Sequence, residues 1–407
     1  MLRTALTALF LTALAPTTAL AQSPADPTPP VLLTAPAPLI TDPAPGPSPE
    51  VPEPPAPPVA TGTTLLLETE QFSLKIAGRL QSRWELFHDS DGDDATDEEL
   101  TNRFSVARAR LTVEGQVFGS TSYKMQTEFG KGFTYLRDYY LDRPLGGIRL
   151  RTGQFKKPFS RQQITSSGSQ QLVDRSLTDA VFDAGRDLGV MLHNGYEKSP
   201  DGLEWAVGLV NGTGDRPITS CTTAIDPTTM AATTTCKAPS NVPADIGPTL
   251  VARAGWNLGG IKGYSESDLE GGPLRVAAGV SYMGNLAEGD PEQMVHRAQA
   301  DVLVKVKGAS LTAAAYVINH RVAGERVTDL GFHLQGGMFL SPKKSEIAVR
   351  LSEVPSDVNK RHEAIIGFNF FLHGHALKWQ TDAGVIHTTG AEVQTDLQVR
   401  TQAQLTF

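Results

Sequence analysis

The sequence predicts an all-β fold, a sixteen-stranded antiparallel transmembrane β-barrel with short periplasmic turns and longer outer loops. Three observations predict it. Apolar and polar residues alternate in many segments, and the connections between these segments are alternately short and long. No apolar run in the chain after residue 21 has the length of a membrane helix. The alternation is clearest in residues 394–407, where Leu397, Val399 and Leu405 share one face of a strand. A soluble sandwich strand alternates too, but it would rarely run this long and end on an apolar residue such as Phe407.

Residues 1–21 have the pattern of a secretory signal peptide. Arg3 supplies the positive charge, an apolar run follows from Ala5 to Ala15, and Ala19-Leu20-Ala21 forms a small-residue cleavage site. The apolar run is too short to be an anchor, since a span needs about twenty apolar residues. An exported chain can still cross a membrane if its strands close into a barrel. We therefore expect the protein to be located in the outer membrane of a Gram-negative-type cell.

Composition agrees with an alternating barrel. The mean hydropathy is -0.19, which averages a lipid face and a lumen face. The formal net charge is -8, and this argues against a nucleic-acid partner.

Residues 22–61 form a separate proline-rich region before the predicted barrel at 62–407. Fifteen of the 37 residues from 24 to 60 are proline, so neither a helix nor a central strand is expected. The composition predicts an extended, semi-rigid segment in the periplasm. It is either a passive linker or a spacer that reaches peptidoglycan or another partner.

Sixteen alternating segments follow the proline-rich region. Their approximate bounds are 72–87, 103–117, 120–130, 134–142, 147–155, 187–196, 202–212, 248–258, 273–284, 295–307, 309–320, 327–339, 345–354, 361–372, 375–386 and 394–407. Tight turns and longer loops should then alternate along the barrel. The connection at 259–272 breaks this rule, because it falls on the periplasmic side and has fourteen residues. Whether this stretch contains a further strand is left open.

The predicted lumen face is basic although the chain is acidic overall. We expect an anion pathway lined by Arg79, Arg83, Arg108, Arg110, Arg149 and Arg151, together with Lys156, Lys157 and Arg161. Lys75 and Lys124 fall on the same face, and so does Glu114. Spaced guanidinium groups bind anions through several donors and can pass them on. The alternative is that these charges balance acids in a wide, unselective lumen.

The predicted outer loop at 156–186 is the second candidate for a functional element. It is long, it follows the fifth strand, and it begins with the basic run Lys156-Lys157-Pro158-Phe159-Ser160-Arg161. Long loops in compact domains are usually functional. The loop either folds into the barrel and sets its narrowest point, or lies on the surface outside the pore.

Four stretches carry a resemblance to a known family. They are Arg151-Thr-Gly-Gln-Phe-Lys-Lys-Pro-Phe159 with Asp174-Arg-Ser-Leu177, then Gly185-Arg-Asp-Leu-Gly-Val190, and Gly263-Tyr-Ser-Glu-Ser-Asp-Leu269. Over residues 65 to 407 the chain resembles the phosphate-selective porin O and P family. The resemblance implies a sixteen-stranded outer-membrane barrel, usually a trimer, with an inward-folded third loop and an arginine-lined path for phosphate. It would place Lys156, Lys157 and Arg161 on that loop. The proline-rich region departs from the family.

The first outer loop contains a weak calcium pattern. Asp89, Asp91 and Asp93 have the spacing of the first ligands of an EF-hand, but Asp94 stands where glycine is needed and Leu100 where the closing glutamate belongs. A solvated acidic loop is the alternative.

The two cysteines, Cys221 and Cys236, lie in one outer loop and could form a disulfide in an exported protein. Their spacing, and that of the histidines, does not match a zinc site. No nucleophile elbow, phosphate-binding loop or metalloprotease helix is found, so we expect neither an enzyme nor a cofactor.

These features predict a porin for passive diffusion of small anions, with phosphate or polyphosphate as the leading solute. Its partners would be outer-membrane lipid and two further copies in a homotrimer. The alternative is a general unselective porin or a surface-adhesive barrel, in which the outer loops matter more than the lumen.

Overall fold

The computed structural model describes residues 65–407, except 90–98, 133, 183–184, 213, 215–220, 226–231, 237–246, 287–294, 323, 357–358 and 391–392. The predicted signal peptide and the proline-rich region lie outside the described residues. So do Asp91 and Asp93 of the calcium pattern, and Asp89 is described only in its backbone. These three expectations therefore stay predictions.

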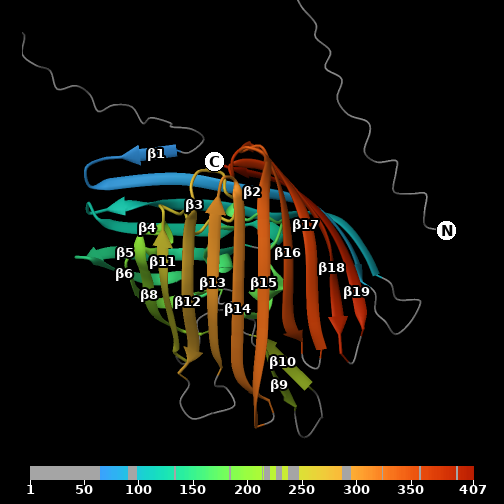
Figure 1. Ribbon diagram of the computed structural model, residues 1–407. Helices are drawn as coiled ribbons and strands as arrows, with labels where there is room; N and C mark the ends of the chain where they lie inside the picture. Colours follow the sequence, from blue (N-terminus) through green and yellow to red (C-terminus); the bar gives the residue numbers. More distant parts are fainter. Residues whose placement is uncertain are drawn as a thin grey trace, which may run out of the picture. The chain divides into compact units, whose positions relative to one another are not determined.

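Sixteen antiparallel strands form a closed barrel (Figure 1). The first group comprises β2 (Phe72–Asp89), β3 (Glu99–Val117), β4 (Thr121–Glu128), β5 (Tyr135–Leu145), β6 (Ile148–Lys156), β7 (Arg186–His193) and β8 (Gly202–Val210). The second comprises β11 (Thr249–Leu258), β12 (Arg275–Asn285), β13 (His296–Val306), β14 (Ala309–Val322), β15 (Glu325–Ser341), β16 (Ser345–Ser356), β17 (Asn359–His373), β18 (Leu377–Thr389) and β19 (Gln394–Thr406). Each of the sixteen predicted segments corresponds to one of these strands.

The last strand closes the barrel against the first. β19 pairs with β2 from Leu397 opposite His88 to Thr406 opposite Arg79. Beyond the ladder, the backbone of Phe407 exchanges hydrogen bonds of 2.7 and 3.0 Å with Gly78. A Cβ at Gly78 would lie 2.3 Å from the Phe407 ring, so the ring packs directly over the glycine and any side chain there would displace it. Closure leaves no unpaired edge, which is the condition for a sheet in lipid.

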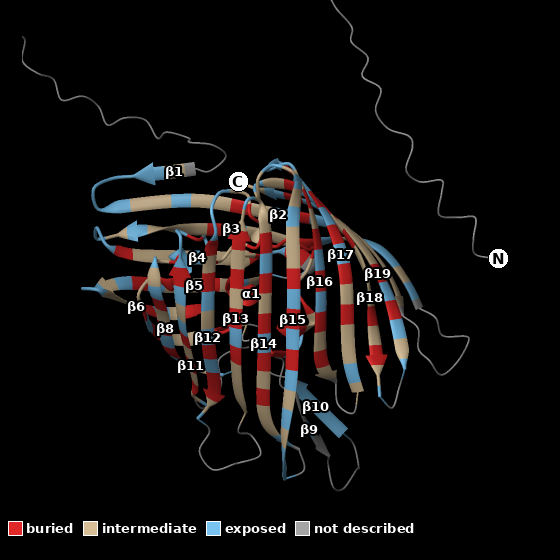
Figure 2. Cartoon of the chain, in the orientation of Figure 1, coloured by how far each residue is buried: buried red, intermediate tan, exposed pale blue. Residues whose placement is uncertain are grey.

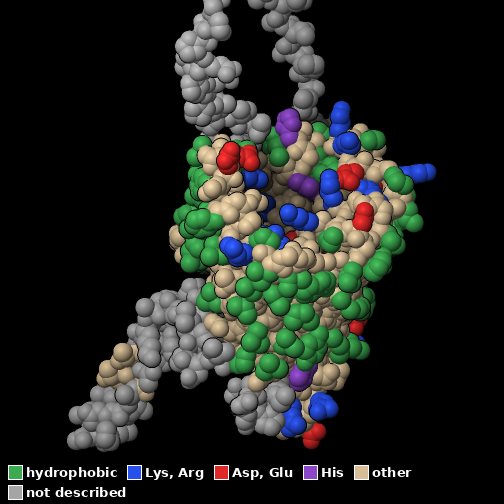
Figure 3. All heavy atoms as spheres, turned by 90° about the vertical axis from the view of Figure 1, so that its left-hand side faces the viewer, with side chains coloured by type: hydrophobic (Ala, Val, Ile, Leu, Met, Phe, Trp, Pro, Cys, Tyr) green, Lys and Arg blue, Asp and Glu red, His purple; other side chains and the backbone are tan. Residues whose placement is uncertain are grey.

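The two faces of the strands differ as the alternation predicts. On β19, Gln398, Gln402 and Gln404 are buried inside, whereas Leu397 and Leu405 are 50% and 41% exposed on the outside. Figure 2 shows the same alternation of buried and more exposed residues along most strands. Figure 3 shows hydrophobic side chains covering much of the outer wall. Trp256 and Trp379 are also exposed there, as expected for residues at a membrane interface.

Three short strands were not predicted. β1 (Leu65–Glu68) pairs with β2 at Ser73 to Ile76, just beyond the residues that pair with β19. β9 (Cys221–Ile225) and β10 (Ala232–Cys236) form a hairpin in the loop after β8. Its register places the backbone of Cys221 opposite that of Cys236, a suitable arrangement for a disulfide, which stays a prediction because these side chains are not described.

The connection between β11 and β12 contains no strand, so the open question raised by its length is answered. Among the described helices, none has the length and apolar character needed to cross a bilayer.

Part of the barrel interior is filled by side chains. One apolar cluster joins Phe159 and Phe182, from the connection after β6, to Val251, Tyr316 and Val354 on the wall. Phe182 and Tyr316 stack with ring centroids 5.2 Å apart. The connection after β6 therefore packs against the inner face of the distant wall.

Replacing Leu334, midway along the outward face of β15, with arginine is expected to lower the free energy of unfolding by about 2–4 kcal/mol, because the charge would lie in the bilayer midplane. Urea unfolding in lipid vesicles measures this cost. Leu340→Arg, near the end of the same strand, is the matched control with an expected cost of about 0–1 kcal/mol. Equal costs at the two positions would contradict this membrane placement.

Candidate functional site

The connection between β6 and β7, residues 157–185, lies inside the barrel; we call it the third loop. It contains α1 (Arg161–Ile164), a turn of 3-10 helix at Ser167–Ser169 and α2 (Leu177–Phe182). The Ser160 side chain accepts a hydrogen bond from the Gln163 backbone and so caps α1. Most of the loop's described residues are buried, including polar ones such as Gln162 and Gln171. The resemblance implied this inward course.

Hydrogen bonds attach the third loop to the opposite wall. Arg161 Nε donates to Asp301 on β13 at 2.5 Å. Gln171 Nε2 donates to Glu346 on β16 at 2.7 Å, and the Val173 backbone donates to Asp382 on β18 at 2.9 Å. Because these partners come from three separate strands, the loop spans the lumen and is fixed on its far side.

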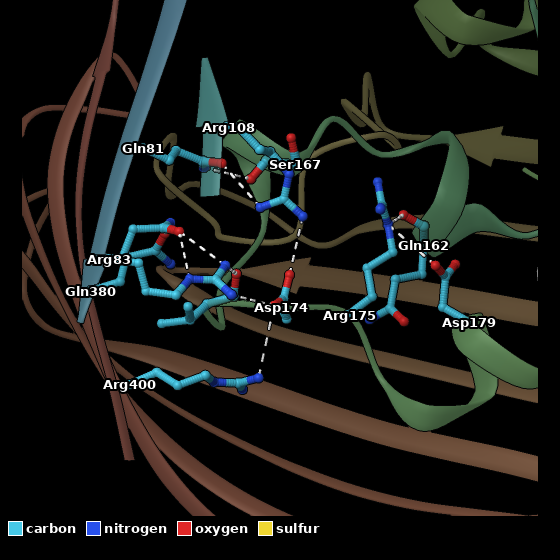
Figure 4. Close-up of polar contacts among 12 residues, drawn as sticks. Gln81, Arg83, Arg108, Gln162, Ser167, Asp174, Arg175, Asp179, Gln380 and Arg400 are labelled. Atoms are coloured by element: carbon cyan, nitrogen blue, oxygen red, sulfur yellow. Dashed lines mark hydrogen bonds and ion pairs between the residues drawn. The ribbon is translucent and has the colours of Figure 1, made fainter. Parts of the chain in front are cut away.

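Asp174 is a further attachment point on the third loop. Arg83 and Arg108 approach its carboxylate at 2.6 and 3.1 Å, and Arg400 lies 3.9 Å away (Figure 4). Burial alone would raise the pKa of Asp174, but Arg108, Arg83 and Arg400 outweigh it and hold the pKa well below its usual range. Asp174 thus stays ionised at neutral pH and neutralises cations that the sequence assigned to the anion pathway.

A second segment enters the barrel from the end opposite to the third loop. It is the connection between β11 and β12, residues 259–274, and we call it the turn segment. Its Glu266 carboxylate accepts hydrogen bonds from the Gln171 backbone and from Gln335 Nε2, both at 2.8 Å. The Glu266 backbone donates to Ser169 of the third loop at 3.1 Å. The two segments therefore hold each other in the lumen.

Two adjoining cavities remain beside these segments, on the side formed by β2–β7. The cavity lined by Arg79 and Lys156, which we call the inner cavity, has a volume of about 430 Å³. The cavity lined by Arg149 and Arg151, which we call the outer cavity, has a volume of about 690 Å³. Lys75, Glu114, Lys124, Tyr140 and Glu197 line both, so the cavities are neighbours. Figure 3 shows a hollow near one end of the barrel with Lys and Arg side chains around it.

The inner cavity has an excess of cations. Its charged lining residues are Lys75, Arg79, Arg110, Lys124, Lys156 and Arg186 against Glu114, Asp138 and Glu197. Arg110 pairs with Glu128 at 2.6 Å, and Arg186 pairs with Asp138 at 2.8 Å.

Arg79 and Lys156 lack such a partner. Arg79 donates to the Ser167 hydroxyl at 3.0 Å, and its Nε is buried without a hydrogen bond. Lys156 donates only to backbone carbonyls, of Ile164 at 2.8 Å and of Thr165 at 3.4 Å. In the described part of the chain neither forms an ion pair with a carboxylate, so no bonded acid offsets a charge on either side chain.

The residues of the predicted anion pathway thus separate into those that line a cavity and those that hold the third loop. Arg79, Arg110 and Lys156 line the inner cavity, and Arg149 and Arg151 line the outer one. In the outer cavity both arginines bond to Asp142, at 2.6 and 2.8 Å.

The remaining predicted cations hold the third loop in place. Arg83 and Arg108 bond to Asp174, Arg161 bonds to Asp301, and Lys157 lies 3.6 Å from Asp187. Strand parity placed Arg83 and Arg108 on the lumen face, and the resemblance placed Lys157 and Arg161 on an inward-folded loop. Neither signal shows which cation meets a carboxylate. Arg186, which begins β7 and lines the inner cavity, was not among the predicted pathway residues.

Comparison with known proteins agrees with this picture. The model of the family described as phosphate-selective porin O and P matches residues 75–232, which confirms the resemblance. No curated protein matches the chain.

Solved structures share the fold at low identity. The outer membrane channel DcaP of Acinetobacter baumannii superposes with a TM-score of 0.53 at 14% identity, over 84% of this chain and 99% of that one. OprB of Pseudomonas putida gives 0.52 at 10%, over 83% and 94%. A loop-deletion form of OmpT of Vibrio cholerae gives 0.52 at 11%, over 82% and 99%. The family match and the closed barrel agree with the fold of outer-membrane porins.

Glu266→Ala is expected to lower the free energy of unfolding by about 1–3 kcal/mol, since the buried donors Gln171 N–H and Gln335 Nε2 would lose their acceptor. We also expect noisier single-channel currents, because the turn segment would no longer hold the third loop. Thermal unfolding and planar-bilayer recordings measure the two effects. The control is Glu270→Ala, an exposed position on the same segment. If both variants behaved alike, Glu266 would not hold the two segments together.

Proposed function

We propose that this chain is an outer-membrane porin through which small anions diffuse passively, with phosphate or polyphosphate as the leading solute. The observation that carries the proposal is the pair of cations, Arg79 and Lys156, that line the inner cavity without a described carboxylate partner. A dissolved anion can supply the negative charge that the protein does not.

The cations form rows along the wall, which supports passage rather than storage. Arg79 lies directly opposite Arg110 in the ladder of β2 and β3. Four residues away on the same strands, Lys75 lies opposite Glu114, which lies opposite Lys124 on β4. Two rows four residues apart are about 13 Å from each other. An anion leaving one row therefore meets cations again within a short distance.

The filled half of the barrel makes the route narrow. The third loop and the turn segment bond to each other and to β13–β18, and the third loop also bonds to Arg83 and Arg108 on β2 and β3. The open space remains along β2–β7. A solute in these cavities stays within reach of the basic rows. Guanidinium groups with several donors suit oxyanions, and partial pairing keeps the binding weak enough for release.

Further assignments belong to the same proposal. We expect the chain to be exported by the signal peptide at 1–21, to assemble as a homotrimer in outer-membrane lipid, and to carry a disulfide between Cys221 and Cys236. The region at 22–61 would act as a periplasmic linker that can reach peptidoglycan. The alternative function is a general unselective porin or a surface-adhesive barrel, for which the excess of cations in the inner cavity would be incidental.

The double variant Arg79→Ala, Lys156→Ala is expected to weaken the block of chloride current by inorganic phosphate at least about tenfold. The loss of one charged donor costs about 1.5–3 kcal/mol, and about 1.4 kcal/mol corresponds to a factor of ten. Phosphate titration in a planar bilayer gives the apparent dissociation constant. Lys262→Ala, an exposed lysine that lines neither cavity, is the control and should leave the block unchanged.

Two results would contradict the proposal. One is a reversal potential under a KCl gradient that shows cation preference, or none, for the unaltered protein. The other is a phosphate block that the double variant leaves at its original strength.

A further inference from the structure

Three charged side chains form one row where the two cavities adjoin. Lys75, Glu114 and Lys124 are cross-strand partners on β2, β3 and β4. The Glu114 carboxylate lies 3.4 Å from Lys75 Nζ and 3.1 Å from Lys124 Nζ. All three line both cavities, so a solute that moves from one cavity to the other passes this row.

The row differs from the other charged row in its access to solvent. The side chains of Lys75, Glu114 and Lys124 are 46%, 32% and 27% exposed. By contrast, the Arg110–Glu128 pair is 9% and 4% exposed, which makes it a structural contact. Only uncharged residues, Ala77, Thr112 and Gln126, separate the two rows along β2–β4. The exposed row is therefore a distinct set of charges that a passing solute can reach.

Glu114 controls the charge of this row. Two ammonium groups and one carboxylate leave a single net positive charge, and the carboxylate occupies donors that an anion would use. An anion must compete with Glu114 for Lys75 and Lys124, whereas at Arg79 and Lys156 it competes only with neutral groups.

We propose that Glu114 is a specificity-determining residue of the channel: by bridging Lys75 and Lys124, it sets how weakly small oxyanions are held where the two cavities meet. The proposal rests on the proposed function in that it takes the cavities as the solute path. With the carboxylate present, an anion leaves the row quickly; without it, the two lysines form an anion site with a charge of two.

The test uses Glu114→Gln in the full-length protein, because glutamine keeps the side-chain length and removes only the charge. We expect the apparent dissociation constant for inorganic phosphate, from block of chloride current, to fall about threefold, in line with the modest strength of exposed ion pairs. The permeability ratio of chloride over potassium should rise by a similar factor. Glu270→Gln removes the same charge from the exposed pair with Lys262, which lines neither cavity, and it should change neither quantity. Lys124→Gln should shift both quantities in the opposite direction.

The outcomes separate the inference from the proposed function. If phosphate blocks the unaltered protein and Glu114→Gln changes neither the block nor the permeability ratio, the inference is wrong while the porin proposal stands. If phosphate does not block the unaltered protein but Glu114→Gln still raises the permeability ratio, the role of Glu114 stands and the phosphate assignment is wrong. Equal shifts in Glu114→Gln and Glu270→Gln would overturn the inference, because they would indicate a general charge effect.

Discussion

The pairing of charges inside a closed barrel is the constraint on which the structure depends. Removing an ion from water costs several kcal/mol unless an opposite charge and further hydrogen bonds replace the lost water. Arg253 shows the solution: it is fully buried, and it bonds to Asp301 at 2.7 Å and to Glu204 at 3.2 Å. Arg161 of the third loop shares Asp301. Because displacing the loop would leave several buried charges without partners, these contacts define one position for it.

The same constraint divides the basic residues of the lumen into two kinds. Arg83, Arg108 and Arg161 bond to carboxylates and hold the third loop, so carboxylates of the protein neutralise their charge. Arg79 and Lys156 bond to neutral oxygens at the inner cavity, and no described carboxylate is paired with either. A chain with a net charge of -8 can therefore present a positive cavity, since many of the acids on its lumen face are consumed by ion pairs.

The strands could be predicted from the sequence because the alternation of apolar and polar residues is local and is repeated from one strand to the next. The predicted segments at 134–142 and 187–196, for example, correspond to β5 and β7. The short strands β1, β9 and β10 have only four or five residues, too few for an alternation to be distinguished from chance. In the sequence, the turn segment was conspicuous only for its length and its polar motif. Its inward course depends on hydrogen bonds from Gln171 and Gln335 to Glu266, and these residues lie 95 and 69 positions away in the chain.

The sequence by itself determined the closed barrel, the two faces of each strand and the basic character of the lumen, because a strand turns every second side chain to the same side. Only the tertiary structure decided which cations are neutralised and where the open space remains. Arg83 meets Asp174 across 91 residues, and Arg161 meets Asp301 across 140. Backbone periodicity fixes the direction of a side chain, but its partner depends on the path of a loop that crosses the whole lumen.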